Sequence, residues 1–570
     1  MLHYQIEFDD YKQHLVHVTI RFLANPNQEL WLPTWIPGSY LIREFSKHIE
    51  SVKAYDEAGR MLDIKKTSKN RWRLFNTDHE LMTLEYDVYA YDLSVRGAYV
   101  DQTRLYINPA CVCLALEGQE QSACELEIFL PDELKHFQLA TGLSSKSLVK
   151  GRFTLKADHY DQLIDSPFEL ADQTRFSFET QGIEHEFVIS GQHNTNLDRL
   201  KADIEKICAT EINMFGSAPF KNYTFMTMAT GSTYGGLEHC NSTSLITPRD
   251  DLPKSNEPAE PSKDYQRFLG LCSHEYFHSW LVKFIRPENF ANYDLHQESY
   301  TSLLWIFEGF TSYYDDLILL RSGVISQKSY LDLLKSQIDR YLQNPGRLIQ
   351  SVSESSFDAW IKFYRQDENS NNAGTSYYNK GALVALCLDL GLRLRGSSLD
   401  DLMRRLYENT QNGVQVNERT IFDLCKELTG DNWVEQINHL INTTDELPLD
   451  QLFPEFGLSY RVKTDKSLPL GLKLVDKPEG VLVQSARRDS VGAKAGISAN
   501  DVIIAIDGLK ASTKLIEKYA KLDGIYTVFA FRRDELISFE VECATSDLTE
   551  VELVVEDQAK TEKWLVKSLD

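Results

Sequence analysis

The sequence predicts a multidomain α+β protein, and changes of hydrophobic pattern along the chain are the evidence for it. Over the first 190 or so residues, apolar and polar side chains alternate with the period of two that is typical of strands. The pattern then becomes mixed and afterwards helical, and near residue 468 it changes again to short strands with many glycines. We therefore expect a β-rich domain at 1–190, a mixed and then helical domain at 191–455, a small domain at 456–548 and a charged surface extension at 549–570.

The alternation in the N-terminal region is clearest at residues 16–22 and 84–90. Between these stretches, the Pro and Gly of Trp35-Ile36-Pro37-Gly38-Ser39-Tyr40 predict a turn bracketed by aromatic side chains. In the second region, residues 223–229 predict a buried strand that leads into a Gly-rich turn. Beyond the helix expected around residues 265–276, helical spacing predicts helices at about 301–321, 326–342, 377–395, 398–411, 418–428 and 432–442.

Composition narrows the class of protein. The chain has 570 residues, of which 42% are hydrophobic, enough for several ordinary cores. Its formal net charge of -24 argues against nucleic acid and anionic membranes as partners, because a basic face for phosphates is not expected. Residues 1–7 lack the pattern of a signal peptide, and a run of about 18 apolar residues is absent. The nine cysteines are scattered and odd in number, so we expect a reduced, cytoplasmic protein.

The most informative motif is His274-Glu275-Tyr276-Phe277-His278, which falls within a predicted helix. Residues four apart lie one above the other on a helix, so the imidazoles of His274 and His278 converge on one point. This spacing is a known zinc-peptidase pattern, in which the glutamate takes a proton from the attacking water. The sequence therefore predicts His274 and His278 as zinc ligands and Glu275 as the general base.

A hydrolytic zinc site has three protein ligands, so one more must come from elsewhere in the chain. Glu298 and Glu308 both follow the motif and are both candidates. We prefer Glu308, because a carboxylate between Trp305 and Phe310 in an apolar helix is costly to bury without a cation. Glu298 lies in a polar stretch, where a solvated carboxylate needs no such partner.

Several motifs together resemble one family of enzymes. Trp305-Ile306-Phe307-Glu308-Gly309-Phe310 is similar to the segment that supplies the third ligand in gluzincin aminopeptidases. With His274–His278, Gly235-Gly236-Leu237-Glu238-His239 and a late PDZ-like segment, the chain resembles the glycyl aminopeptidase family of gluzincin zinc metallopeptidases. The resemblance implies a thermolysin-like catalytic domain with one zinc ion per chain. It also implies an aminopeptidase that favours small N-terminal residues such as Gly and Ala.

Two further segments supply predicted site residues. Gly235 and Gly236 let a peptide backbone approach closely, and the Glu238 carboxylate is suited to hold the α-ammonium of a substrate. The segment 377–381, Tyr-Tyr-Asn-Lys-Gly, resembles the Tyr-x-Lys-Gly motif of these enzymes, whose tyrosine hydroxyl donates to the oxyanion. By register Tyr378 is the match, and Tyr377 is the alternative.

The small domain at 456–548 resembles a bacterial PDZ domain. Pro469-Leu470-Gly471-Leu472 is similar to a carboxylate-binding loop, and Asp501-Val502-Ile503 is similar to a strand of that fold. The resemblance implies a C-terminal peptide as a ligand, in addition to peptide substrates with a free N-terminus. Two other functions stay open: an endopeptidase of the same chemistry that recruits proteins through this domain, and a catalytically silent peptide-binding scaffold.

Overall fold

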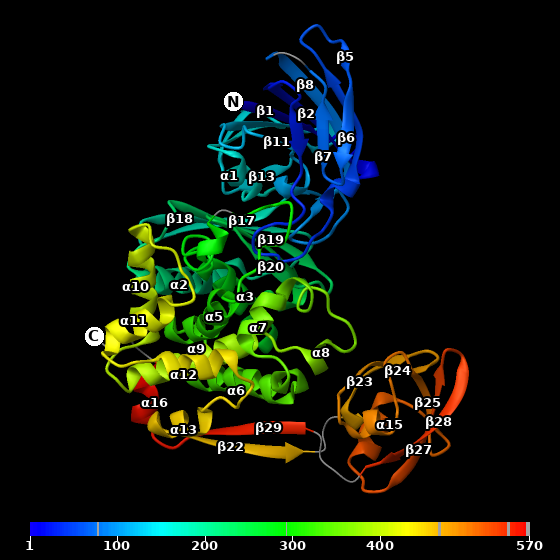
Figure 1. Cartoon of the computed structure of the whole chain (residues 1–570), viewed down its shortest axis with the longest axis vertical. Coiled ribbons are helices and arrows are strands. Elements are labelled where there is room, and N and C mark those ends of the chain that lie inside the picture. Colours follow the sequence, from blue (N-terminus) through cyan, green and yellow to red (C-terminus); the bar gives the residue numbers. More distant parts are fainter. Residues whose placement is uncertain (77–78, 292, 466–468, 544–547, 566–570) are drawn as a thin grey trace. The chain divides into compact units, whose positions relative to one another are not determined.

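The computed structural model describes residues 1–76, 79–291, 293–465, 469–543 and 548–565. They form two compact units. The first contains residues 1–299 with two short later segments, and the second contains 300–321, 326–405 and 417–570. In Figure 1 the blue and cyan N-terminal part is built of strands, and the green and yellow middle part is mainly helical. The predicted β-rich start and helical centre are therefore confirmed.

The N-terminal part of the first unit is β structure because its alternating sequence buries every second side chain. In β2 (Leu15–Leu23), Val16, Val18, Ile20 and Phe22 are buried. This strand lies in an eight-stranded sheet with the order β14-β15-β12-β1-β2-β8-β4-β5, in which only β1 and β12 pair in parallel. The other strands are β1 (Leu2–Glu7), β4 (Ile49–Tyr55), β5 (Met61–Leu62), β8 (Leu81–Tyr89), β12 (Cys124–Phe129), β14 (Ser144–Val149) and β15 (Arg152–Ala157).

Two four-stranded sheets complete this part, with the orders β13-β16-β10-β9 and β11-β3-β7-β6. Their strands are β3 (Glu29–Trp31), β6 (Ile64–Ser68), β7 (Arg71–Leu74), β9 (Ala98–Val100), β10 (Arg104–Ile107), β11 (Ala115–Leu116), β13 (Gln138–Thr141) and β16 (Phe168–Ala171). The predicted turn at 35–40 follows β3, and Gly38 adopts a φ of 88° there. Trp35 Nε1 donates to the carbonyl of Asp294 at 2.9 Å, which attaches the turn to a distant segment of the same unit.

A five-stranded sheet, in the order β17-β18-β19-β21-β20, follows. Its strands are β17 (Thr174–Thr180), β18 (Ile183–Ser190), β19 (Asn222–Thr230), β20 (Gly235–Glu238) and β21 (Ser242–Pro248). The sheet crosses the predicted domain boundary at residue 190, because β18 pairs in parallel with β19. β20 lies at the end of the sheet and pairs antiparallel with β21 alone among the described strands.

The first unit also contains α1 (Tyr160–Ile164), α2 (Leu197–Phe215) and α3 (Lys263–Phe277). α3 carries the histidine motif. It begins where the Ser262 side chain accepts the backbone N–H of Tyr265, and it buries Tyr265, Phe268, Leu269 and Tyr276. This apolar face fixes the rotation of the helix, and the rotation in turn decides where the two histidines point.

The helices of the second unit before residue 456 cover the six predicted ranges and add three short ones, at 352–357, 370–373 and 449–455, that were not predicted. They are α4 (Leu304–Phe307), α5 (Gly309–Arg321), α6 (Gln327–Gln343), α7 (Val352–Phe357), α8 (Ser370–Ala373), α9 (Asn379–Arg393), α11 (Thr420–Thr429), α12 (Val434–Asn442) and α13 (Leu449–Glu455), and the residues of α10 (Leu399–Gln411) are divided between the two units. The single helix predicted at 301–321 is two helices, which meet at Glu308.

The C-terminal segment differs from the expected surface extension. β29 (Leu548–Val555) pairs antiparallel with β22 (Leu458–Asp465), as the two-stranded ribbon in Figure 1 shows. α16 (Gln558–Leu565) follows, and Trp564 in it is 0% exposed. The segment is therefore part of a core, because its few apolar residues face inward while its many charged residues face solvent.

Between these two strands the chain forms a small β domain. Its sheet has the order β23-β24-β25-β27-β28, with β26 paired to β25, around a core that includes Leu472, Val481, Ile503 and Val541. The elements are β23 (Leu472–Lys477), β24 (Gly480–Ala486), α14 (Val491–Lys494), β25 (Val502–Ile506), β26 (Leu509–Lys510), α15 (Thr513–Ala520), β27 (Ile525–Arg532) and β28 (Glu535–Glu542).

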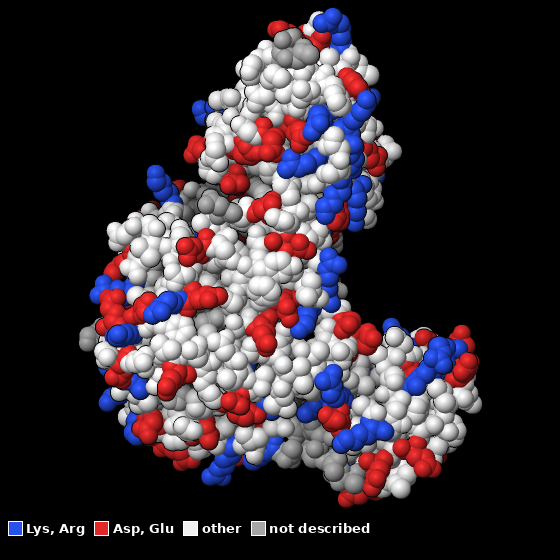
Figure 2. Space-filling view, viewed as in Figure 1, with Lys and Arg blue, Asp and Glu red and all other residues white. Residues whose placement is uncertain are grey.

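Acidic and basic side chains are intermixed over the face that Figure 2 shows. On that face the acidic residues are not gathered in a single patch. Among the helices in the described part of the chain, none has the length and apolar character needed to cross a membrane.

Candidate metal centre

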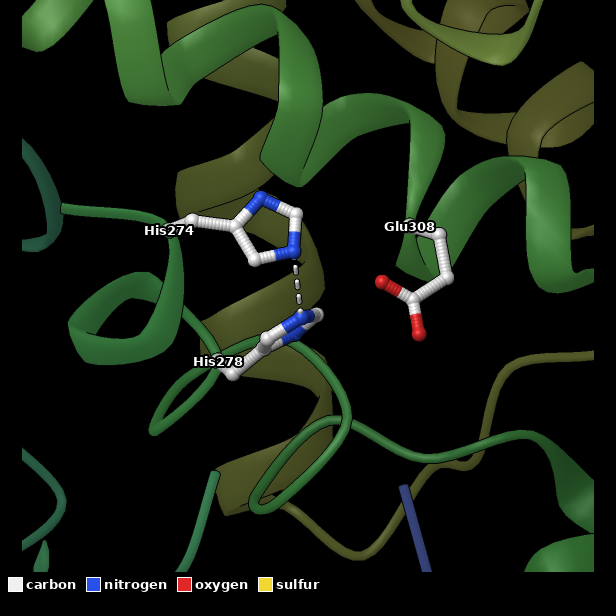
Figure 3. Close-up of side chains that lie close together, drawn as sticks. All are labelled: His274, His278 and Glu308. Atoms are coloured by element: carbon white, nitrogen blue, oxygen red, sulfur yellow. Dashed lines mark hydrogen bonds between the residues drawn. The ribbon is translucent and has the colours of Figure 1, made fainter. Parts of the chain in front are cut away.

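The spacing of the histidine motif brings the two imidazoles together at the end of α3. Their Nε2 atoms face each other at 3.1 Å (Figure 3). His278 Nδ1 lies 3.0 Å from the carbonyl oxygen of Leu281, to which only a protonated nitrogen can donate. This contact assigns the proton of a neutral His278 to Nδ1 and leaves the Nε2 lone pair for a metal.

Glu308 completes a group of three side chains that could hold a metal ion. One donor atom each of His274, His278 and Glu308 lies within 4.8 Å of the others (Figure 3). Glu308 is 2% exposed, so a cation there would compensate the cost of burying its charge. Two imidazole nitrogens and one carboxylate oxygen are the donors that zinc takes in hydrolytic sites, so the residues fit the predicted metal. In the part of the chain that the structure describes, Glu298 belongs to no such group.

A close helix crossing explains the glycines that follow Glu308 and Lys380 in the sequence. A Cβ at Gly309 would overlap the backbone of Gly381, so α5 and α9 approach more closely than larger residues allow. Tyr378 immediately precedes α9. Burial, and after it the negative charge of Glu308, raises the pKa of Tyr378 well above its ordinary value, so the hydroxyl keeps its proton. Tyr377, the alternative, is fully buried.

Glu238, the last residue of strand β20, belongs to a second group of side chains that could hold a metal ion. One donor atom each of Glu238, Glu275 and His278 lies within 4.8 Å of the others. Glu238 is 4% exposed, and its Oε1 has no hydrogen-bond partner among the described residues. A buried carboxylate oxygen without a donor is costly, so this atom is suited to a positively charged group that arrives with a ligand.

The two glycines of β20 have different surroundings. A Cβ at Gly236 would overlap the carboxylate of Glu275, so this glycine makes room for the predicted general base. Gly235 has open space beside its Cα, with the nearest atom, Nη1 of Arg96, 3.9 Å from a Cβ placed there. The predicted close approach of a peptide backbone is therefore sterically available at Gly235, whereas Gly236 accommodates the enzyme's own side chain.

Three residues near Glu238 were not predicted as site residues. Gly38 lies directly against the Glu238 carboxylate, which a Cβ at this position would overlap. Asp165 accepts from the backbone N–H of Cys240 at 3.0 Å, and its Oδ1 lies 2.5 Å from Lys283 Nζ. The turn at 35–40 was a visible signal for Gly38, but nothing in the sequence pairs Asp165 with Lys283.

Comparisons with known proteins show the family to which the chain is similar. A family model described as the peptidase M61 N-terminal domain matches residues 3–172, and one described as M61 glycyl aminopeptidase matches residues 267–384. The structure of an aminopeptidase N family protein from Idiomarina loihiensis is 40% identical, with a TM-score of 0.95, and the match covers 100% of both chains. A search of curated proteins gives no match.

More distant similarities are also found. An M1 zinc metallopeptidase from Deinococcus radiodurans is 12% identical with a TM-score of 0.49, over 79% of this chain and 94% of that one. A yeast LTA4 hydrolase is 13% identical with a TM-score of 0.44, over 78% and 68%. The site and the closer match define the protein as a metallo-aminopeptidase. The chain belongs to the M61 peptidase family.

Proposed function

We propose that this metallo-aminopeptidase uses one zinc ion per chain, held by His274, His278 and Glu308. The proximity of their three donor atoms supports the proposal. When bound, zinc supplies a Lewis acid that polarises the scissile carbonyl and makes water a better nucleophile.

The remaining chemistry comes from the chain itself. Glu275 accepts the proton of the attacking water and passes it to the leaving amine. Its carboxylate is 5% exposed and lies against Gly236, which restricts it to the site. Tyr378 donates a hydrogen bond to the oxyanion that develops at the scissile carbonyl. Its raised pKa supports this role, because only a protonated hydroxyl can donate.

We further propose that Glu238 binds the α-ammonium of the substrate and so restricts cleavage to the first residue. The single observation that carries this proposal is its buried Oε1, which lacks a donor among the described residues and belongs to the same group as Glu275 and His278. A charge-assisted hydrogen bond to an ammonium would satisfy that oxygen.

Three finer features belong to the same proposal. The resemblance to glycyl aminopeptidases favours small first residues such as Gly and Ala. The scattered cysteines, all free thiols, favour a cytoplasmic location. A C-terminal peptide would bind the small β domain beside β23, which ends its sheet and follows a loop with positive φ at Leu470 and Gly471.

Metal analysis combined with a pair of substrates tests the proposal. We expect about one zinc per chain, and removal of zinc by a chelator should abolish hydrolysis of a glycyl amide until zinc is returned. The N-acetylated amide should resist cleavage, because it has no ammonium for Glu238. Full activity after complete metal removal would contradict the zinc proposal, and equal cleavage of both amides would instead favour an endopeptidase.

A further inference from the structure

We propose that a cavity beside Glu238 binds the side chain of the substrate's first residue, and that it accepts a large, uncharged aromatic side chain. The cavity has a volume of about 590 Å³, and all of its lining residues belong to the first unit. The inference rests on the proposed function, because it requires Glu238 to hold the α-ammonium. It extends the substrate range beyond glycine and alanine.

The position of the cavity follows from Glu238, which lines it. The same carboxylate lies within 4.8 Å of donor atoms of Glu275 and His278. In an amino acid, the ammonium and the side chain are attached to the same carbon. A residue whose ammonium contacts Glu238 therefore has its side chain next to this carboxylate, where the cavity begins.

One wall of the cavity is aromatic. Trp35 and Tyr293 pack edge to face with ring centroids 5.6 Å apart, and Tyr40 lies 5.8 Å from Phe290. Trp35 and Tyr40 belong to the predicted turn at 35–40, whose Gly38 touches the Glu238 carboxylate. The turn thus contributes both to the ammonium site and to the cavity. Rings at such spacings provide apolar faces and edges against which another aromatic ring packs well.

The strongest charges in the wall are already paired. Asp165 Oδ1 lies 2.5 Å from Lys283 Nζ and 3.3 Å from His239 Nδ1. Burial works to raise the pKa of Asp165, but the positive charge of Lys283 and the contact with His239 lower it well below its ordinary value. The carboxylate therefore stays ionised and engaged. The remaining charged residues of the lining, apart from Glu238, are of both signs: Asp158, Asp161, Lys221 and Arg286.

The mixture of positive and negative charges in the cavity lining favours an uncharged substrate side chain. A cationic or anionic side chain would lose water in the cavity, where the Asp165–Lys283 pair is already matched and the other charged residues of the lining are of both signs. An aromatic side chain loses little on transfer and gains contact with the rings of the wall.

The cavity is held in shape by a strained turn after α3. Val282, which lines the cavity, adopts a φ of 99°, a conformation that β-branched residues rarely adopt. The turn is closed by a bond from Val282 N–H to the Ile285 carbonyl at 2.9 Å. The next residue, Lys283, donates its N–H to the His278 carbonyl at 3.0 Å and directs its side chain to Asp165. This turn therefore connects His278, a proposed metal ligand, with the cavity wall. Surrounding contacts must hold the turn in its strained conformation.

The volume decides between small and large residues. The methyl group of alanine needs space on the order of one water molecule, ~30 Å³. A cavity of about 590 Å³ lies within the range of pockets that hold whole small molecules, and is far larger than a methyl group requires.

The holoenzyme tests the inference with glycyl, alanyl, phenylalanyl and arginyl amides of one reporter. We expect kcat/KM for the phenylalanyl amide to be within about tenfold of the glycyl value or above it, and the arginyl amide to be at least about tenfold poorer than the phenylalanyl amide. A larger loss for phenylalanine, or an arginyl amide cleaved as well as the phenylalanyl one, would overturn the inference. If no amide is cleaved, the proposed function fails; if only glycyl and alanyl amides are cleaved, the cavity inference alone fails.

A variant at Cys240, which lines the cavity, tests its location. Cys240→Trp should lower the ratio of phenylalanyl to glycyl kcat/KM by at least about tenfold, whereas Cys240→Ser, of similar size, should leave the ratio unchanged. Asn194→Trp, at an exposed position outside the lining, controls for a surface tryptophan. An unchanged ratio in Cys240→Trp would overturn the inference. Should that variant not fold, inhibition of the wild type decides: free L-phenylalanine should inhibit at lower concentration than glycine, and the reverse order would overturn it.

Discussion

Helix α3 and strand β20 bring side chains to the same place, but they depend on different kinds of information. α3 positions His274 and His278 through their spacing on one helix, and the Leu281 carbonyl that orients His278 is only three residues away. β20 contributes Glu238, whose surroundings come from Gly38 and from the cavity wall, far away in the sequence. The comparison teaches that the convergence of the two histidines is encoded locally, whereas the proposed site of substrate recognition is assembled from distant segments.

The largest expected effect concerns the proposed metal site, to which α3 contributes its two histidines. Glu308→Ala should lose zinc and all measurable activity, because a third ligand disappears from a buried site. Glu298→Ala is the matched control, since it removes a partly exposed glutamate that belongs neither to the group of Glu308 nor to the group of Glu238. Zinc content by elemental analysis and hydrolysis of a glycyl amide are the measurements. Loss of zinc in Glu298→Ala with zinc retained in Glu308→Ala would reverse the ligand assignment.

Removal of the proposed general base should affect catalysis but not zinc binding. Glu275→Gln should keep about one zinc per chain while kcat falls by roughly 10²- to 10⁴-fold, because no ligand is lost but the proton acceptor is. Steady-state kinetics on the zinc-loaded variant provide the test. Turnover close to that of the wild type would rule out Glu275 as the general base.

Removal of the proposed oxyanion donor should have a smaller effect on kcat. Tyr378→Phe should lower kcat by about 10²- to 10³-fold with little change in zinc content, as expected when one oxyanion donor is lost. Tyr377→Phe removes the neighbouring hydroxyl and is the control. If Tyr377→Phe has the greater effect on kcat, the neighbouring residue is the donor.

The β20 side of the comparison depends on the turn at 35–40. Gly38→Ala should displace the Glu238 carboxylate and lower kcat/KM for a free-amine substrate by about tenfold, with zinc retained. Gly59→Ala is the matched control: Gly59 also has a positive φ, of 77°, but has open space around its Cα. Both variants carry similar backbone strain, so equal losses of activity would mean that contact with Glu238 is unimportant.

The sequence predicted the regular elements well where one face alone is buried. The longer helices between residues 301 and 442 and the histidine helix follow from their apolar spacing, whereas the short α7, α8 and α13 were not predicted. α2 was not predicted, because its buried face includes Asp203, bound to Arg199 and Tyr265, and Glu211, bound to Ser273. Buried polar residues interrupt the apolar pattern of a helix. They can be recognised as buried only when their hydrogen-bond partners are known.

The surroundings of Glu238 could not be predicted for a related reason. Gly38 lies 200 positions before Glu238, and only the folded chain shows that the two touch. The C-terminal segment was misjudged because Trp564 is one of few apolar residues in a charged stretch, and its burial requires the rest of the second unit. Local spacing therefore predicts the two histidines of the proposed metal site, whereas tertiary contacts define the surroundings of Glu238.

The central claim, that β20 recognises the substrate amine while α3 provides the chemistry, is tested most directly by Glu238→Ala. If Glu238 binds the ammonium, the contact contributes roughly 1.5–3 kcal/mol as a charge-assisted hydrogen bond. We measure kcat/KM for a glycyl amide and its N-acetylated partner, on the zinc-loaded wild type and variant. The account predicts a loss of about 10- to 150-fold on the free amine and no loss on the acetylated amide, which the wild type should barely cleave. Equal losses on both substrates would contradict it and would mean that Glu238 supports the fold or the metal.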